Sequence, residues 1–286
     1  NYNVTVGDEA GTAITTGDNN SALGYSSLAA NTTGTRNTAV GTSAGTAITT
    51  GGNNTVMGYN ALATNTVGDR NVAIGEGALQ THNPSSNADT YNVAVGYDAG
   101  NAVTTATHNT LIGALAGDSL TTGASNVAVG YGALTTDDVG QHNVAIGRDA
   151  LSAQNIASAA NTYNTAVGSS AGAAVTTGTS NTLIGGLAGN ANTTGGNNTF
   201  VGKSAGVANT TASSNTFVGE RAGTANTTGD ESVAVGQFAY SANTTGVDNV
   251  AIGRSALAAN TTAHNNVAIG RSALLSNTTG TRNASV

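Results

Sequence analysis

The pentapeptide Asn71-Val72-Ala73-Ile74-Gly75 recurs along the whole chain, and its recurrence decides the fold. Identical copies stand at 143–147, 249–253 and 266–270, and looser copies fill the spaces between. Val and Ile suit a pleated strand, and Gly permits a tight turn. A short strand closed by a turn and repeated at a fixed period indicates a β-solenoid.

The spacing of the copies divides the chain into units without linkers. Successive copies are 17 residues apart, except that the units starting at 71 and 143 have 21 residues. The units begin at residues 3, 20, 37, 54, 71, 92, 109, 126, 143, 164, 181, 198, 215, 232, 249 and 266. We therefore predict one repeat solenoid over residues 1–286, with about 16 coils of 17 residues. A last copy, starting at Asn283, is truncated, so we expect the chain to be a fragment of a longer fibre protein.

Within a unit numbered from its Asn, three consecutive positions are apolar or β-branched. Position 2 is mostly Val or Thr, position 3 mostly Ala, and position 4 always aliphatic or Met. Side chains of a strand alternate between its faces, so positions 2 and 4 share one face and position 3 lies on the other. A strand that is apolar on both faces is buried on both faces. We expect Asn at position 1 to cap a turn, tolerate a left-handed backbone and form a ladder of amides.

Residues at positions 9 and 12 trade volume through the first ten units. Gly45 accompanies Ile48, for example, whereas Leu62 accompanies Asn65. Where both positions are small, position 3 enlarges, as at Phe200. Close-packed interiors require this compensation, so these three positions are predicted to share one core.

A second short strand is predicted over positions 11–14, followed by a Thr-Thr-Gly turn. Coils stacked at about 4.8 Å would then make a rod on the order of 75 Å long. One thin coil has a single interior, so the second apolar face of the strand needs another sheet. Identical chains around an axis would supply it, with the Ala residues of position 3 near that axis, and a symmetric homo-oligomer is expected.

Composition and charge exclude several classes of function. The chain has no Cys, so disulfides and thiolate metal sites are excluded. The formal charge of -7 leaves no basic stripe for a nucleic acid. No apolar run approaches the roughly 20 residues of a membrane span, so direct membrane insertion is not expected.

The pattern of the unit that runs from Asn249 to Thr262 resembles two groups of surface fibres. The Asn-Val-Ala-Ile-Gly pentad, with Ala three residues after its Gly, is similar to the head repeats of trimeric autotransporter adhesins. The whole unit also looks like repeat regions of phage tail fibres. The resemblance implies a left-handed parallel β-roll that forms a homotrimer.

Side chains that could act in catalysis or bind a metal are scattered along the sequence rather than clustered. No Ser-His-Asp, phosphate-loop or repeated calcium-binding pattern is present, so no catalytic, cofactor or metal site is predicted and the chain is not expected to be an enzyme. We expect the four histidines to be solvated turn residues and the acidic pairs to be surface charge. The histidines are His82, His108, His142 and His264, and the acidic pairs are Asp137-Asp138 and Asp230-Glu231.

Four tyrosines directly follow the position-5 Gly in every second unit of the first half. A row of exposed Tyr at about 9–10 Å intervals could stack on sugars or pack on a partner. These candidate ligand or partner contacts are Tyr25, Tyr59, Tyr97 and Tyr131.

We therefore expect a structural shaft or head of an extracellular or virion fibre, or a surface adhesin that mediates attachment. Its partners would be two further copies of the chain and a host surface glycan or protein receptor. An alternative is an ice- or glycan-binding solenoid that acts through one flat face, because Thr-Thr pairs recur at positions 13 and 14.

Overall fold

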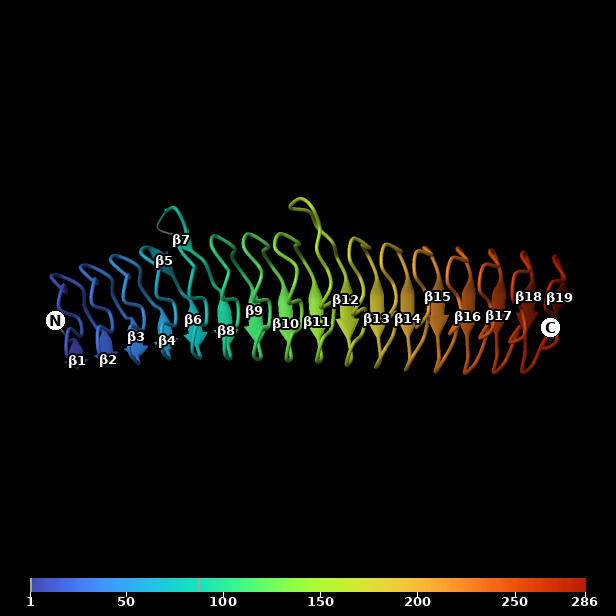
Figure 1. Ribbon diagram of the computed structural model, residues 1–286, viewed down its shortest axis with the longest axis horizontal. Helices are drawn as coiled ribbons and strands as arrows, with labels where there is room; N and C mark the ends of the chain where they lie inside the picture. Colours follow the sequence, from blue (N-terminus) through green and yellow to red (C-terminus); the bar gives the residue numbers. More distant parts are fainter. Residues whose placement is uncertain (1, 87) are drawn as a thin grey trace. The chain divides into compact units, whose positions relative to one another are not determined.

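Each copy of the pentad forms a strand in the computed structural model, which describes residues 2–86 and 88–286. The chain is an all-β parallel β-solenoid of about 17 turns (Figure 1), with no helix among the described residues. This confirms the fold class that the repeat predicts. The chain divides into two compact units, Asn1–His142 with Ile156–Asn161, and Asn143–Asn155 with Thr162–Val286.

Both compact units carry one strand per coil, formed by positions 2–4. The strands of the first unit are β1 (Val4–Val6), β2 (Ser21–Leu23), β3 (Thr38–Val40), β4 (Thr55–Met57), β6 (Val72–Ile74), β8 (Val93–Val95), β9 (Thr110–Ile112) and β10 (Val127–Val129). Those of the second are β11 (Val144–Ile146), β12 (Thr165–Val167), β13 (Thr182–Ile184), β14 (Thr199–Val201), β15 (Thr216–Val218), β16 (Val233–Val235), β17 (Val250–Ile252), β18 (Val267–Ile269) and β19 (Ala284–Ser285). Within each compact unit, the strands of neighbouring coils pair in parallel, with residues of the same position side by side. Thr199 pairs with Thr216 in this way.

The strand turns position 3 into the solenoid and positions 2 and 4 outward. Position-3 side chains from Ala39 to Ala268 are fully buried, whereas Ile184 and Ile252, at position 4, are 38% exposed. The expectation that the small position-3 residues lie near an axis between chains is therefore wrong. They are small because the interior of the coil is narrow, and the larger aliphatic residues are the ones that remain exposed.

The interior confirms the trade of volume between positions 3, 9 and 12. A Cβ added at Gly45 would lie 2.9 Å from Ile48 Cδ1, so the Ile fills the space that Leu occupies at position 9 of other coils. A Cβ at Gly206 would lie 2.6 Å from the ring of Phe200. Phe200 and Phe217 stack with ring centroids 5.0 Å apart. Most coils therefore hold one large side chain in this space, from whichever position supplies it, and the coil that starts at Asn109 holds two, Leu111 and Leu120.

The buried Asn at position 1 forms the predicted ladder, and it also closes its own coil. Asn198 Nδ2 donates to Ala212 O at 2.8 Å, and the backbone N–H of Asn215 donates to Asn198 Oδ1 at 3.0 Å. The left-handed residue is the preceding one, at position 17, as Asn197 shows with φ 57°. Asn at position 1 is therefore needed for its amide rather than for its backbone conformation.

The second strand predicted over positions 11–14 is wrong, because these residues form turns. Backbone hydrogen bonds join neighbouring coils at positions 11 and 13 of this segment, as from Ala30 N to Thr46 O at 3.0 Å. Thr32 N and Thr32 Oγ1 both bond to Thr49 O, at 2.9 and 3.1 Å, and most coils repeat this pair of contacts at position 13. These contacts do not form a regular strand, yet they bond this edge of each coil to the next.

The two four-residue expansions leave the ladder intact. In the first, β7 (Ala88–Asp89) pairs in parallel with β5 (Gly68–Asp69) of the preceding coil. Both expansions rise above the turns of the neighbouring coils (Figure 1). At the end of each, a buried Thr continues the ladder, since Thr90 Oγ1 donates to Asn71 Oδ1 at 2.8 Å and Thr162 Oγ1 donates to Asn143 Oδ1 at 2.6 Å.

Candidate ligand-contact surface

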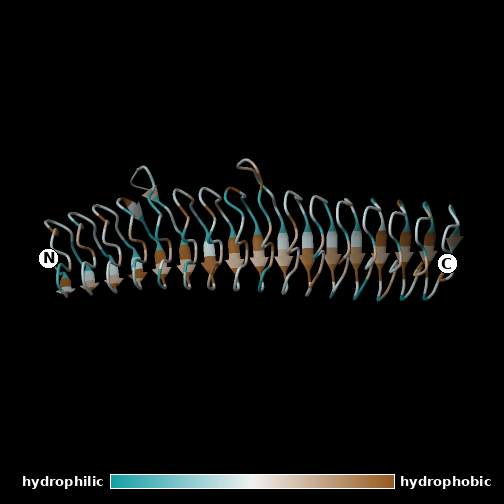
Figure 2. Ribbon diagram, viewed as in Figure 1, coloured by the Kyte–Doolittle hydropathy of each residue, from teal (hydrophilic) through white to brown (hydrophobic). Residues whose placement is uncertain are grey.

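The corner of the coil that follows the strand presents position 6 to solvent. The position-5 Gly turns the chain with φ near 130°, and a Cβ there would lie against the Gly of the next coil. Because Gly at this point leaves no side chain, successive coils approach closely and the position-6 side chains form an outward row. Figure 2 shows the hydrophobic residues gathered on the strands and the polar ones at the turns.

The structure places the four candidate tyrosines in this row of the first compact unit, all about half exposed. Tyr25, Tyr59, Tyr97 and Tyr131 have exposed fractions of 50, 54, 53 and 56%. Hydrogen bonding to Asp98, together with the negative charges of Asp98 and Glu76, raises the pKa of the Tyr97 hydroxyl. The rings are open to solvent on a rigid corner, which is the arrangement that a contact with a sugar or a partner requires.

A fifth tyrosine, which the sequence did not single out, lies in a cluster beside the first expansion. The Tyr91 ring has the Arg70 guanidinium carbon 5.7 Å from its centroid and the His108 ring 5.5 Å away. Tyr91 also donates to Asp89 Oδ2 at 3.1 Å, and Asp89 forms an ion pair with Arg70. The signal in the sequence is the position-17 row, which brings residues 70, 91 and 108 onto consecutive coils.

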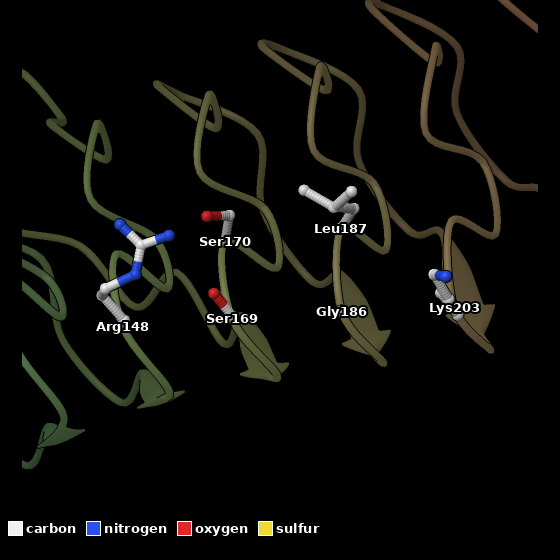
Figure 3. Close-up of a pocket in the computed structure, with 6 residues that line it drawn as sticks. All are labelled: Arg148, Ser169, Ser170, Gly186, Leu187 and Lys203. Atoms are coloured by element: carbon white, nitrogen blue, oxygen red, sulfur yellow. The ribbon is translucent and has the colours of Figure 1, made fainter.

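The second compact unit carries a hollow in the same row. Four consecutive coils line a cavity of about 440 Å³ whose walls are mostly apolar. Arg148 lies at one end and Lys203 at the other, and the coils between them carry only small position-6 residues (Figure 3). The lining residues are Arg148, Ser169, Ser170, Gly186, Leu187 and Lys203. Sequence analysis missed this hollow, although two adjacent small residues between two cations are its signature.

The histidines and acidic pairs were all predicted to be exposed to solvent, and the structure confirms this for some of them but not for others. His108, His142 and His264 are exposed, but His82 is fully buried at position 12. Asp137 is also buried at position 12, where its Oδ1 accepts the N–H of Gly140 at 3.0 Å, as the Asn65 amide does for Gly68. These two were wrongly assigned to the surface, because position 12 points inward whichever residue occupies it. Asp230 and Glu231 are exposed.

No group of three or more acidic or histidine side chains could hold a metal ion within residues 2–86 and 88–286. The same residues contain no helix long and apolar enough to cross a membrane. Comparison with known proteins finds no matching family model and no similar curated protein.

Proposed function

We propose that this chain is the shaft or head of an extracellular or virion fibre, or a surface adhesin, and that it acts as a homotrimer. The observation that supports this most is the exposed band of each compact unit, here called the aliphatic band, formed by the aliphatic residues of position 4 and by the residues of position 2, mostly Val or Thr. Each strand contributes roughly 10 Å by 4.8 Å of this band, so eight strands present on the order of 400 Å² per unit. This is the size of the largest apolar patch on a typical monomer, about 300–600 Å², and such a patch is often functional.

Further copies of the same chain fit this band better than an unrelated partner. The band repeats every coil in register, so only a surface with the same spacing can cover all of it. An identical chain has that spacing by construction, and closed symmetry would leave no end of the band exposed. The resemblance to trimeric adhesin heads and tail fibres favours three chains over two.

The stacked coils suit a mechanical role. Most coils are bonded to their neighbours within their compact unit by the strand, by the position-1 amide and by the position-13 Thr. Such contacts distribute load along the chain and leave few mobile segments. The row of Tyr25, Tyr59, Tyr97 and Tyr131 is proposed as a contact for a host glycan or protein receptor. A glycan-array signal lost in Tyr59→Ala would identify it.

The ice-binding alternative has less support. The hydroxyls at position 13 donate to the next coil, so only the position-14 Thr residues form an exposed rank. A flat ice-binding face built on two ranks of Thr is therefore not formed.

Sedimentation equilibrium of residues 1–286 tests the proposal. A stable species at three times the chain mass of 27.7 kDa is the expected result. A monomer at micromolar concentration would contradict it, because the aliphatic band would then remain in water.

A further inference from the structure

We infer that the hollow between Arg148 and Lys203 binds a short acidic oligosaccharide. This rests on the proposed attachment function, to which it adds the chemical class of the ligand. The volume of about 440 Å³ lies within the range of about 300–1,000 Å³ that small-molecule sites occupy. Three strand spacings separate the coils of the two cations, or about 14 Å along the coils, which makes the hollow an elongated trough.

The hollow is preorganised by backbone hydrogen bonds between the coils that line it. The N–H of each position-7 residue donates to the position-6 carbonyl of the preceding coil. The bonds are Ser170 N to Arg148 O at 2.8 Å, Leu187 N to Ser169 O at 3.0 Å and Ser204 N to Gly186 O at 2.9 Å. A site held by its own backbone loses little conformational entropy on binding.

The charges of the trough favour an anion. Lys203 is exposed and forms no ion pair within the described part of the chain. Its neighbour Glu220 accepts a hydrogen bond from Gln237 Nε2 at 2.9 Å, on the side away from the trough. Arg148 Nη1 donates to Asp149 at 2.8 Å, which leaves other guanidinium N–H groups for a ligand. The trough can therefore take a carboxylate or sulfate at the Lys203 end and a second polar group at Arg148.

The wall between the cations fits a sugar better than a peptide. Leu187 is 41% exposed and offers an apolar surface to the C–H face of a sugar ring, while the Ser169 and Ser170 hydroxyls can donate to or accept from ring hydroxyls. A peptide that added as a strand would need free backbone groups. The hydrogen bonds between coils already use the position-7 N–H and position-6 C=O groups of this wall.

Isothermal titration of residues 1–286 with defined tetrasaccharides tests the inference. The probes are a tetragalacturonate, a sulfated heparin tetrasaccharide and neutral maltotetraose. We expect heat from at least one acidic probe and none from the neutral one. A carboxylated or a sulfated preference then identifies the anionic group. Equal binding of maltotetraose, absence of binding by both acidic probes, or preference for a tetraglutamate peptide would overturn the inference.

Variants of the wall provide the matched controls. Gly186→Tyr should fill the trough and abolish binding without strain, because a Cβ there meets nothing within 4 Å and Tyr occupies the same position at Tyr131. Arg271→Tyr places the same ring at position 6 outside both the trough and the tyrosine row, and should bind like the parent. Lys203→Ala should weaken binding roughly tenfold, as expected for a charge-assisted hydrogen bond, whereas Arg254→Ala should not. Binding that survives Gly186→Tyr would place the ligand elsewhere.

The result is independent of the assembly test. If the chain is a trimer but binds none of the acidic probes, only the proposed ligand is wrong. If the chain is a monomer and binds an acidic probe through the trough, the proposed trimeric fibre is wrong and the proposed binding site is supported.

Discussion

At the residue scale, the side-chain amide of position 1 stabilises the fold by hydrogen bonds both within its own coil and to the next coil. It satisfies a carbonyl of its own coil and an N–H of the next, and both are buried. Ser232 is the one substitute among the 16 units, and it keeps a contact at 3.3 Å from the N–H of Asn249 to its hydroxyl. A side chain that accepts from the next coil is therefore the minimum that this position requires.

Asn198→Ala should lower the free energy of unfolding of the surrounding coils by about 3 kcal/mol. The N–H of Asn215 would be left buried without a partner, which costs roughly 1–3 kcal/mol, and Ala212 O would lose one of its two donors, the other being Asn209 Nδ2 at 3.0 Å. Amide hydrogen exchange near residues 198–215 measures the local loss. Asn198→Ser is the control and should lose about half as much, since Ser retains an acceptor. Equal losses in both variants would show that the accepting role is unimportant.

His82 should make stability depend on pH. Burial lowers the pKa of His82 from 6.5 to about 4. Below pH 6.5 the unfolded chain binds a proton that the folded chain does not bind until about pH 4. The free energy of unfolding should therefore fall between pH 6.5 and pH 4, by up to about 3 kcal/mol, and then level off.

Urea denaturation of the parent and His82→Asn at pH 7 and pH 4.5 measures this contribution. Asn is the residue that position 12 carries at Asn65, so the variant should fold and lack most of the difference between the two pH values. If the two proteins lose equal stability on acidification, His82 is not the titrating group.

At the scale of the element, the strand is only three residues long, and the turn after it decides how closely the coils stack. Gly202 has φ 137°, and a Cβ there would lie 2.5 Å from Gly219 O. No side chain fits this contact, and the backbone conformation is one that other residues avoid. The Gly that closes each strand is therefore a stacking residue as much as a turn residue.

Gly202→Ala should destabilise the second compact unit by at least about 3 kcal/mol, because it adds both a clash and backbone strain. Gly186→Ala, one coil away, should change stability by less than about 1 kcal/mol, since its Cβ meets nothing within 4 Å and its φ is not positive. Thermal unfolding followed by circular dichroism compares the two. Similar losses in both variants would mean that close stacking at position 5 is not what selects Gly.

At the scale of the whole molecule, the exposed aliphatic band is the surface through which we propose that the chains assemble. Ile184→Asp combined with Ile252→Asp places charges on two residues that are 38% exposed in the single chain. The coil should still fold, because neither side chain lies in its interior. The trimer should dissociate to a monomer, since each charge would be buried against its symmetry mates without a partner.

Sedimentation equilibrium of this double variant measures the change. Thr194→Asp combined with Thr245→Asp adds the same charge to the exposed position-14 rank and should leave the mass unchanged. A trimer that withstands the Ile substitutions would show that the chains meet through another face.

The sequence by itself determined the coil, its length, the register and the compensation of volume inside it. Each coil contacts chiefly its neighbours, so the period of Asn, Gly and aliphatic residues is also the period of the structure. The exposed tyrosines follow from the same period, because a residue directly after the position-5 Gly lies outside the strand.

Tertiary structure decided which face of the strand lies inside. Alternation assigns positions 2 and 4 to one face and position 3 to the other, but both faces are apolar, and only the narrow width of the coil selects the small residue for the interior. The burial of His82 and Asp137 and the trough between Arg148 and Lys203 were decided in the same way. All three features depend on how side chains of neighbouring coils pack. Space that one coil leaves empty is either filled by a side chain of the core or remains open as a binding site.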